Sequence, residues 1–215
     1  MLVPLISAAR NGWRLAALLV TIGVCLCAAQ EEAPEMRIRL KSMEFDPLTT
    51  PQPEAPVGGD RWIVQFKRSL TRAEMEQVQQ EYGLRLDHYI PEGAYLERAD
   101  AGRVADLRRD PLVRWVGPHL PEYKPDPAVL QRGCADPSRE IAILVEGYAD
   151  VSSEVLLGAI RHAGYTRAEA VGSPAQGTPR VRVFVSGAAD VTALTRLPEV
   201  LHVEPPPRIV IDRDE

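Results

Sequence analysis

Histidine and cysteine are the residues of this chain best suited to metal binding or nucleophilic chemistry. The sequence holds three cysteines and four histidines, His88, His119, His162 and His202. Structural and catalytic zinc sites draw ligands from short paired spacings, such as two cysteines or two histidines a few residues apart. The four histidines are instead separated by long stretches of chain. The sequence therefore predicts no metal site, and it predicts surface or partly packed positions for these side chains.

Motifs for covalent catalysis or phosphate binding are also missing. No Gly-x-Ser-x-Gly nucleophile elbow occurs in the sequence. The segment Gly172–Gly177 is rich in glycine, but it lacks the Lys-Ser/Thr ending of a phosphate loop and precedes a strand-like run rather than a helix. A hairpin loop is the better interpretation. The sequence predicts neither catalytic residues nor a cofactor.

Residues 61–118 show a regular order of predicted elements. A β-branched run at Trp62–Lys67 precedes a helical pattern that ends at Gly83. Two further strand-like runs meet at Pro91–Gly93, and a second helical pattern covers Ala101–Arg109 before a last strand. The order β-α-β-β-α-β predicts the split βαβ, or ferredoxin-like, motif.

Residues 139–205 repeat this order. The phrase Pro198–Pro205 echoes Pro111–Pro118 as P-x-V-x-(aromatic or His)-V-x-P, and Gly164 ends a helical pattern as Gly83 does. Matching order and spacing indicate a tandem duplication. We therefore expect an α+β protein of two tandem ferredoxin-like domains, each too small to be more than marginally stable alone.

The second copy contains its own strands and helices. Its first helix is expected to end at His162. The apolar stripe of that helix is predicted to consist of Val155, Leu156, Ala159 and Ile160. The other expected elements are strands at 141–145, 181–185 and 200–203 and a short helix at 190–196.

The first and last strands of the first copy carry apolar residues on both faces. This pattern is typical of strands that are covered on both sides. In a split βαβ fold the helices cover one face only, so the other face is either wrapped by a local segment or is a partner surface. Ordinary packing and scattered surface apolar residues are the simpler alternatives.

Several phrases resemble the propeptides of subtilisin-like serine proteases, which act as inhibitors and folding chaperones. These phrases are Trp62–Lys67, Asp87–Leu96, Asp110–Val116 and Pro121–Lys124. The doubled arrangement is similar to the prodomain upstream of some secreted bacterial enzymes, more closely in the first copy than in the second. The phrases that carry the subtilisin triad are absent from the sequence, so the resemblance transfers no catalytic residue.

The resemblance implies a binding function. Subtilisin propeptides dock a sheet face on the protease, while the tail after the last strand lies in the active-site cleft by β-strand addition. The expected sheet-face contacts are Trp62, Val64, Phe66, Val113 and Trp115, and the expected tail contacts are Pro207, Arg208, Ile209, Val210 and Ile211. The implied partner is a subtilisin-like serine protease, in cis or in trans. From the residues alone, the tail equally fits a disordered terminus or an extra strand.

Two other functions fit the sequence. The chain ends at Glu215, where a member of the resembled family would begin its catalytic domain, so it also fits a truncated prodomain fragment of a secreted protease. It fits equally a secreted, non-enzymatic interaction module, because ferredoxin-like folds host many unrelated roles.

The first 29 residues have the pattern of a secretory signal peptide. Arg10 and Arg14 flank the apolar run Leu15–Cys27, which is short for a membrane span. Small residues before Gln30 predict cleavage after Ala29. We expect a secreted or periplasmic protein without a stable membrane span, and an uncleaved anchor is the alternative.

The remaining segments are predicted to be connecting chain. Residues 30–59 are acidic and proline-rich, residues 119–138 form a proline-rich connector with few contacts, and residues 206–215 form the tail. Once the leader is removed, Cys134 is the one remaining cysteine, so no intrachain disulfide is expected. The net charge of −5 disfavours nucleic acid or an anionic membrane as the partner.

Overall fold

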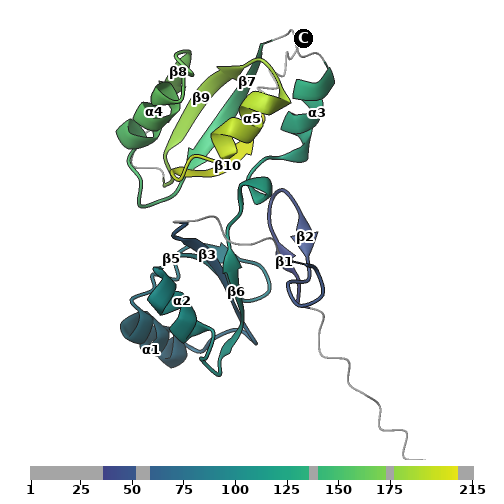
Figure 1. Cartoon of the computed structure of the whole chain (residues 1–215). Coiled ribbons are helices and arrows are strands. Elements are labelled where there is room, and N and C mark those ends of the chain that lie inside the picture. Colours follow the sequence, from purple (N-terminus) through teal and green to yellow (C-terminus); the bar gives the residue numbers. More distant parts are fainter. Residues whose placement is uncertain (1–35, 52–58, 136–139, 173–176, 208–215) are drawn as a thin grey trace, which may run out of the picture. The chain divides into compact units, whose positions relative to one another are not determined.

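The computed structural model describes residues 36–51, 59–135, 140–172 and 177–207 (Figure 1). The predicted signal peptide, residues 208–215 of the predicted tail, and residues 173–176 of the glycine-rich loop lie outside the described residues. The described residues belong to one compact unit that spans residues 35–215.

The first repeat has the predicted order of elements. They are β3 (Arg61–Phe66), α1 (Arg72–Tyr82), β4 (Tyr89–Ile90), β5 (Ala94–Arg98), α2 (Ala101–Leu107) and β6 (Val113–Pro118). The four strands form an antiparallel sheet in the order β4-β5-β3-β6. If the strands of this repeat are numbered one to four along the chain, strand one (β3) lies between strand three (β5) and strand four (β6).

Local signals explain where α1 begins and ends. Thr71 caps the N-terminus in a capping box, because its hydroxyl accepts from the backbone N–H of Glu74 and the Glu74 carboxylate accepts from that of Thr71. Gly83 ends the helix in the left-handed region at φ 61°. Between β4 and β5 the chain turns through Glu92 and Gly93, both at positive φ.

The second repeat copies the first. Its elements are β7 (Ile141–Gly147), α4 (Ser153–His162), β8 (Ala168–Ala170), β9 (Arg180–Val185), α5 (Ala188–Thr195) and β10 (Val200–Glu204). The antiparallel sheet has the order β10-β7-β9-β8, the same arrangement as in the first repeat. Leu156 and Ile160 of α4 are fully buried as predicted, but Val155 is 54% exposed, so its assignment to the apolar stripe was wrong.

Two segments predicted to be connecting chain are packed against the repeats. Residues 38–45 form an antiparallel hairpin of β1 (Ile38–Arg39) and β2 (Glu44–Phe45), whose Ile38 and Phe45 are buried. The connector holds a 3-10 turn, η1 (Pro121–Tyr123), and a helix, α3 (Pro127–Ala135). The expectation that few contacts hold the connector is wrong, because Leu120, Tyr123 and Val129 are all at most 5% exposed.

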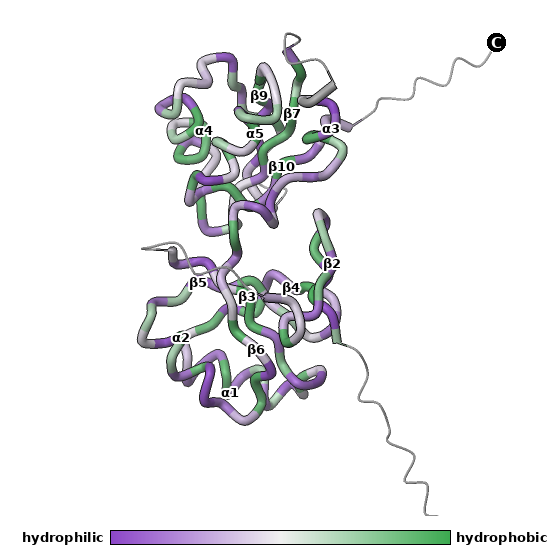
Figure 2. Tube along the Cα trace, turned by 45° about the vertical axis from the view of Figure 1, so that its right-hand side comes forward, coloured by the Kyte–Doolittle hydropathy of each residue, from purple (hydrophilic) through white to green (hydrophobic). Residues whose placement is uncertain are grey.

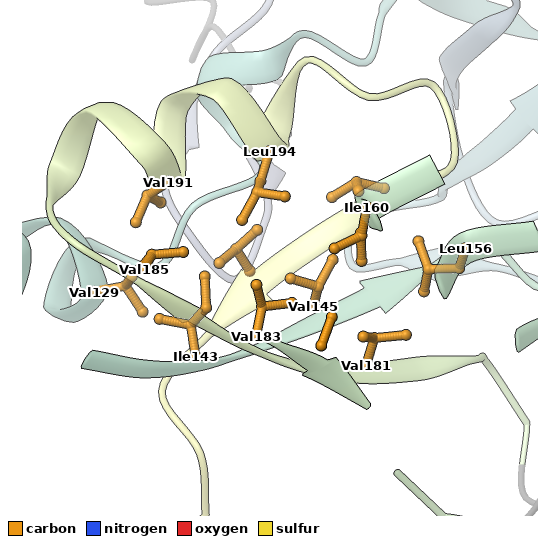
Figure 3. Packing of buried hydrophobic residues seen from close by; sticks show 13 residues of the cluster. Val129, Ile143, Val145, Leu156, Ile160, Val181, Val183, Val185, Val191 and Leu194 are labelled. Carbon is orange, nitrogen blue, oxygen red and sulfur yellow. The ribbon is translucent and has the colours of Figure 1, made fainter. Parts of the chain in front are cut away.

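Three clusters of buried side chains hold these elements together. In the second repeat, alternate residues of β7 and β9 point toward α4 and α5, and Val129 of α3 joins them (Figure 3). A second cluster lies between the first sheet and its helices α1 and α2. A third combines the hairpin, the other face of the first sheet, the connector, and Tyr148 and Leu201 of the second repeat. Residues 141–145 of β7 are hydrophobic, whereas α1 is mostly hydrophilic (Figure 2).

The predicted α+β class is confirmed, since helices and antiparallel sheets alternate along the described chain. Within the described ranges, no helix combines the length and apolar character that crossing a membrane requires.

Candidate functional site

Four of the five predicted sheet-face residues lie beneath the helices of the first repeat. Trp62, Val64 and Phe66 of β3 are at most 8% exposed and pack with residues of α1 and α2. Val113 of β6 belongs to the same cluster. The assignment of these four residues to an open face is therefore corrected: they form the core of the first repeat. The indole N–H of Trp62 donates to the carbonyl of Ala99 at 3.0 Å, which satisfies its buried donor.

The fifth residue, Trp115, points to the opposite face because β6 contains a bulge. Phe66 pairs with Val113, whereas Gln65 pairs with Trp115, so Arg114 is the extra residue. In a regular strand, Val113 and Trp115 would point to the same face. The bulge at Arg114 makes their side chains point to opposite faces. Trp115 packs edge-on against Phe45 of the hairpin, with ring centroids 6.2 Å apart.

The face of the first sheet that carries Trp115 is covered by the chain itself. Ile63 and Leu96 are buried there against Ile38 and Phe45 of the hairpin and Leu120 of the connector. The first sheet is therefore wrapped by a local segment, which is one of the two alternatives that the sequence leaves open.

The corresponding face of the second sheet is partly exposed at β9, where it bears charged and aromatic side chains, whereas Leu144 and Glu146 of β7 and His202 of β10 are at most 6% exposed on the same face. On β9, Val181, Val183 and Val185 point into the core, so Arg182 and Phe184 point to the other side. A guanidinium N–H of Arg182 donates to the Glu169 carboxylate at 2.8 Å. The guanidinium of Arg167 lies 4.2 Å from the centre of the Phe184 ring, a cation–π contact.

The predicted tail begins after β10, an edge strand of the second sheet. Pro207 is exposed, and Arg208, Ile209, Val210 and Ile211 lie outside the described residues. The outer edge of β10 is partly occupied by the connector: the Val203 N–H donates to the Lys124 carbonyl at 2.9 Å, and the Asp126 N–H to the Val203 carbonyl at 2.8 Å.

Three of the four histidines line a single pocket. His88 follows α1 and precedes β4, His119 follows β6, and His202 lies in β10. The pocket has a volume of about 330 Å³, and Arg39 and Lys41 of the hairpin and Glu146 of β7 also line it. The prediction of surface or partly packed positions is wrong for His119 and His202, which are at most 8% exposed, whereas His88 is partly buried as predicted. Among the described residues, no group of three or more histidine, cysteine or acidic side chains could hold a metal ion.

Burial keeps these imidazoles neutral. Desolvation lowers the pKa of His88 and of His202, and it lowers that of His119 well below its ordinary value. Lys124, the imidazoles of His88 and His202, and Arg61 lower the pKa of His119 further, because a positive charge on any of them disfavours its protonated form. Lys124 is itself buried, which lowers the pKa of its ammonium group to about 8.

The contact between the two repeats is centred on Tyr148. Its ring lies 4.0 Å from the guanidinium carbon of Arg61, and its hydroxyl lies 2.8 Å from Nδ1 of His119. Arg61 also forms an ion pair with Asp150 at 2.8 Å. No local sequence signal marks these residues, because each contact joins positions far apart in the chain.

The comparisons with known proteins include a match to a protein family. Residues 39–120 match the model of a protein family described as a domain of unknown function (DUF8729). No curated protein matches the chain. The matched range begins in β1 and ends two residues after β6, so it includes both the hairpin and the first repeat.

Proposed function

We propose that the chain is an exported, non-enzymatic binding module made of two tandem ferredoxin-like domains of the subtilisin-propeptide type. In this proposal it inhibits, or assists the folding of, a subtilisin-like serine protease, in cis or in trans. The second repeat carries the binding surface, and the tail after β10 enters the protease cleft.

The observation that carries the proposal is the difference between the two sheets. The first sheet is covered on both faces by the chain itself, whereas Arg182 and Phe184 of the second sheet point away from their own core. A protease that docks on a propeptide sheet needs an uncovered face. A specific interface buries about 800 Å² on each partner, which one sheet face with an extended tail can supply.

The ends of the two repeats favour the same assignment. The residues that follow β6 turn back into η1, where Leu120 and Tyr123 are buried, so this segment has no free length to extend into a cleft. The residues that follow β10 lead directly to exposed Pro207. An extended segment at the end of an edge strand can pair its backbone with a cleft, as β-strand addition requires.

The test is an inhibition assay of the mature chain against several subtilisin-like proteases. Deletion of residues 207–215 removes the tail and should raise the inhibition constant roughly a hundredfold, because the backbone pairing in the cleft is lost. Phe184→Ala removes the aromatic contact of the open face and should weaken inhibition about tenfold.

Leu48→Ala is the matched control, because Leu48 is 62% exposed but lies beside the hairpin rather than on the second sheet. It should leave the inhibition constant unchanged. Equal constants for the full-length and tail-deleted proteins would remove the tail from the mechanism. No inhibition by either protein would reject the inhibitor proposal in favour of an interaction module with another partner.

A further inference from the structure

The histidine-lined pocket has the size and position of a small-molecule site. Its volume of about 330 Å³ falls at the lower end of the range for ligand pockets. Side chains from the hairpin, the first repeat, the connector and the second repeat all line it. Such pockets combine apolar walls with a few polar groups that fix the orientation of the ligand.

His202 supplies an unsatisfied polar group in this pocket. Its side chain is 6% exposed, and its Nε2 atom is buried without a hydrogen-bond partner. The carboxylate of Glu204 lies 3.9 Å from this nitrogen, which is too far for a hydrogen bond. A buried polar atom left unpaired costs about 1–3 kcal/mol, so a ligand atom that pairs with Nε2 recovers that free energy.

The walls beside the histidines are aliphatic. Ile90, Leu96 and Leu201 line the pocket and are each at most 7% exposed. These side chains favour a ligand with a hydrocarbon body, because burying apolar surface is the main favourable contribution to such binding.

The charges near the imidazoles have both signs, and Arg39 and Lys41 make the hairpin side of the pocket the one that favours an anionic head group. Lys124 acts most strongly on His119, followed by the other two imidazoles and Arg61, and all of them lower its pKa, whereas Glu204, Glu146 and Asp126 raise the pKa of His202. Glu146 already accepts hydrogen bonds from Lys41, Thr178 and Arg180, and Glu204 pairs with Lys41 at 3.5 Å. The acidic groups are therefore engaged, whereas the imidazole nitrogen of His202 is not.

The full set of charges around the three imidazoles comes from four parts of the chain. They are Arg39 and Lys41 of the hairpin, Arg61 and Asp87 of the first repeat, Lys124 and Asp126 of the connector, and Glu146, Tyr148 and Glu204 of the second repeat.

We propose that this pocket binds a small aliphatic carboxylate, with its hydrocarbon body against Ile90, Leu96 and Leu201 and its carboxylate accepting hydrogen bonds from the imidazoles, led by His202. The ligand is either a free aliphatic acid or the C-terminal residue of a peptide, since both present the same chemistry. This proposal does not rest on the proposed protease-binding function, although Glu146, Leu201 and His202 of the pocket belong to β7 and β10 of the same second sheet whose β9 carries Arg182 and Phe184.

Binding should be coupled to proton uptake. The imidazoles are neutral in the empty pocket, and a buried carboxylate stabilises their protonated form. Affinity should therefore rise as the pH falls from 8 toward 6.5, by up to tenfold per pH unit for each proton taken up. A ligand without a charge gives no such dependence.

The experiment is an NMR and calorimetric titration of the mature chain without protease. The probes are hexanoate and N-acetyl-leucine, and hexanamide and N-acetyl-leucinamide are their uncharged counterparts. Both carboxylates should shift the resonances of pocket residues, and calorimetry in buffers of different ionisation enthalpy should show proton uptake. Binding of hexanoate alone would assign the site to free aliphatic acids, and binding of N-acetyl-leucine alone to peptide C-termini.

His202→Leu should weaken carboxylate binding roughly tenfold or more, because it removes the charge-assisted hydrogen bond. His88→Ala tests the same pocket at a half-buried position, where the fold tolerates the change more readily. His162→Ala, on the exposed side of α4, is the matched control. Equal binding of carboxylates and amides, or no binding of either, would overturn the proposal, while the inhibition assay would still decide the protease-binding function separately.

Discussion

Nδ1 of His119 lies 2.8 Å from the hydroxyl oxygen of Tyr148 in a fully buried contact that joins the end of the first repeat to the end of β7 in the second. The ring of Tyr148 also contacts the guanidinium of Arg61, and the ammonium group of Lys124 lies 5.8 Å from the ring centre. A proton added to His119 therefore enters a buried site where the nearest charges are already positive.

Acid should loosen this contact. The pKa of His119 in the folded protein lies well below its ordinary value near 6.5, so the stability that it contributes is fully present above pH 6.5. This stability is lost as the pH falls below 6.5 toward the folded-state pKa, by about 1.4 kcal/mol per pH unit for one proton. Urea unfolding at pH 7.5 and pH 5.5 measures the loss.

His119→Gln should be less stable than the native chain at pH 7.5, but its stability should depend less on pH because the titrating group is gone. His162→Gln, a change at an exposed position, should keep the full dependence. The same pH dependence in the native chain and in His119→Gln would contradict the prediction.

The bulge in β6 should depend on Arg114. Its guanidinium donates to Oε1 of Gln65 at 2.7 Å and to the Asp46 carboxylate at 3.3 Å, and Gln65 is fully buried. Arg114→Met leaves that buried oxygen without this donor, which should lower the free energy of unfolding by about 1–3 kcal/mol. Arg109→Met, at an exposed position, should change it by less than about 0.5 kcal/mol. Similar effects of the two changes, measured by urea unfolding, would show that the bulge does not need Arg114.

Two glycine-to-alanine changes should have opposite effects. A Cβ atom on Gly117 would lie 2.0 Å from the ring of Trp115, so Gly117→Ala must displace the indole and should cost about 1–3 kcal/mol. A Cβ atom on Gly158, inside α4, meets nothing within 4 Å. Gly158→Ala should therefore stabilise the protein by about 0.5–1 kcal/mol. Thermal unfolding compares the two, and destabilisation by both would contradict the assigned environment of Gly158.

The sequence predicted best the features that local signals decide. The end of α1 at Gly83 and the turn at Glu92–Gly93 depend on residues a few positions apart, and they lie where they were expected. The repeated order of strands and helices follows from hydrophobic periodicity, which is also local. These signals were sufficient for the α+β class.

Features that depend on distant contacts were not predictable in this way. The residues of β6 do not reveal that Arg114 is a bulge, so Val113 and Trp115 were assigned to one face although they point to opposite faces. The three histidines line one pocket although they lie far apart in the chain, and the connector that follows His119 is hydrogen-bonded to β10, which carries His202. Residues 38–45 have too short an apolar pattern to show that they cover a sheet.

The connector should resist proteolysis, in contrast to the expectation from its composition. Lys124 is 5% exposed, its ammonium group donates to the carbonyl of Leu197, and its own carbonyl accepts from the Val203 N–H. Chymotrypsin needs an extended, accessible segment, so the native protein should not be cut after Tyr123, which is 5% exposed, whereas the protein in urea should be cut there rapidly. Mass spectrometry of timed digests measures the ratio of the two rates.

Gly133→Ala tests whether the packing of α3 provides this protection. A Cβ atom at Gly133 would lie 2.6 Å from the backbone nitrogen of Ala188 in α5, and backbone cannot move aside as a flexible side chain can. The change should push α3 away from α5, destabilise the second repeat by about 1–3 kcal/mol, and speed chymotryptic cleavage after Tyr123. Gly158→Ala serves as the control, because it also replaces a helical glycine but in open space. Rapid cleavage after Tyr123 in the native protein would mean that the contacts of the connector open readily, and equal rates in both variants would mean that α3 does not protect it.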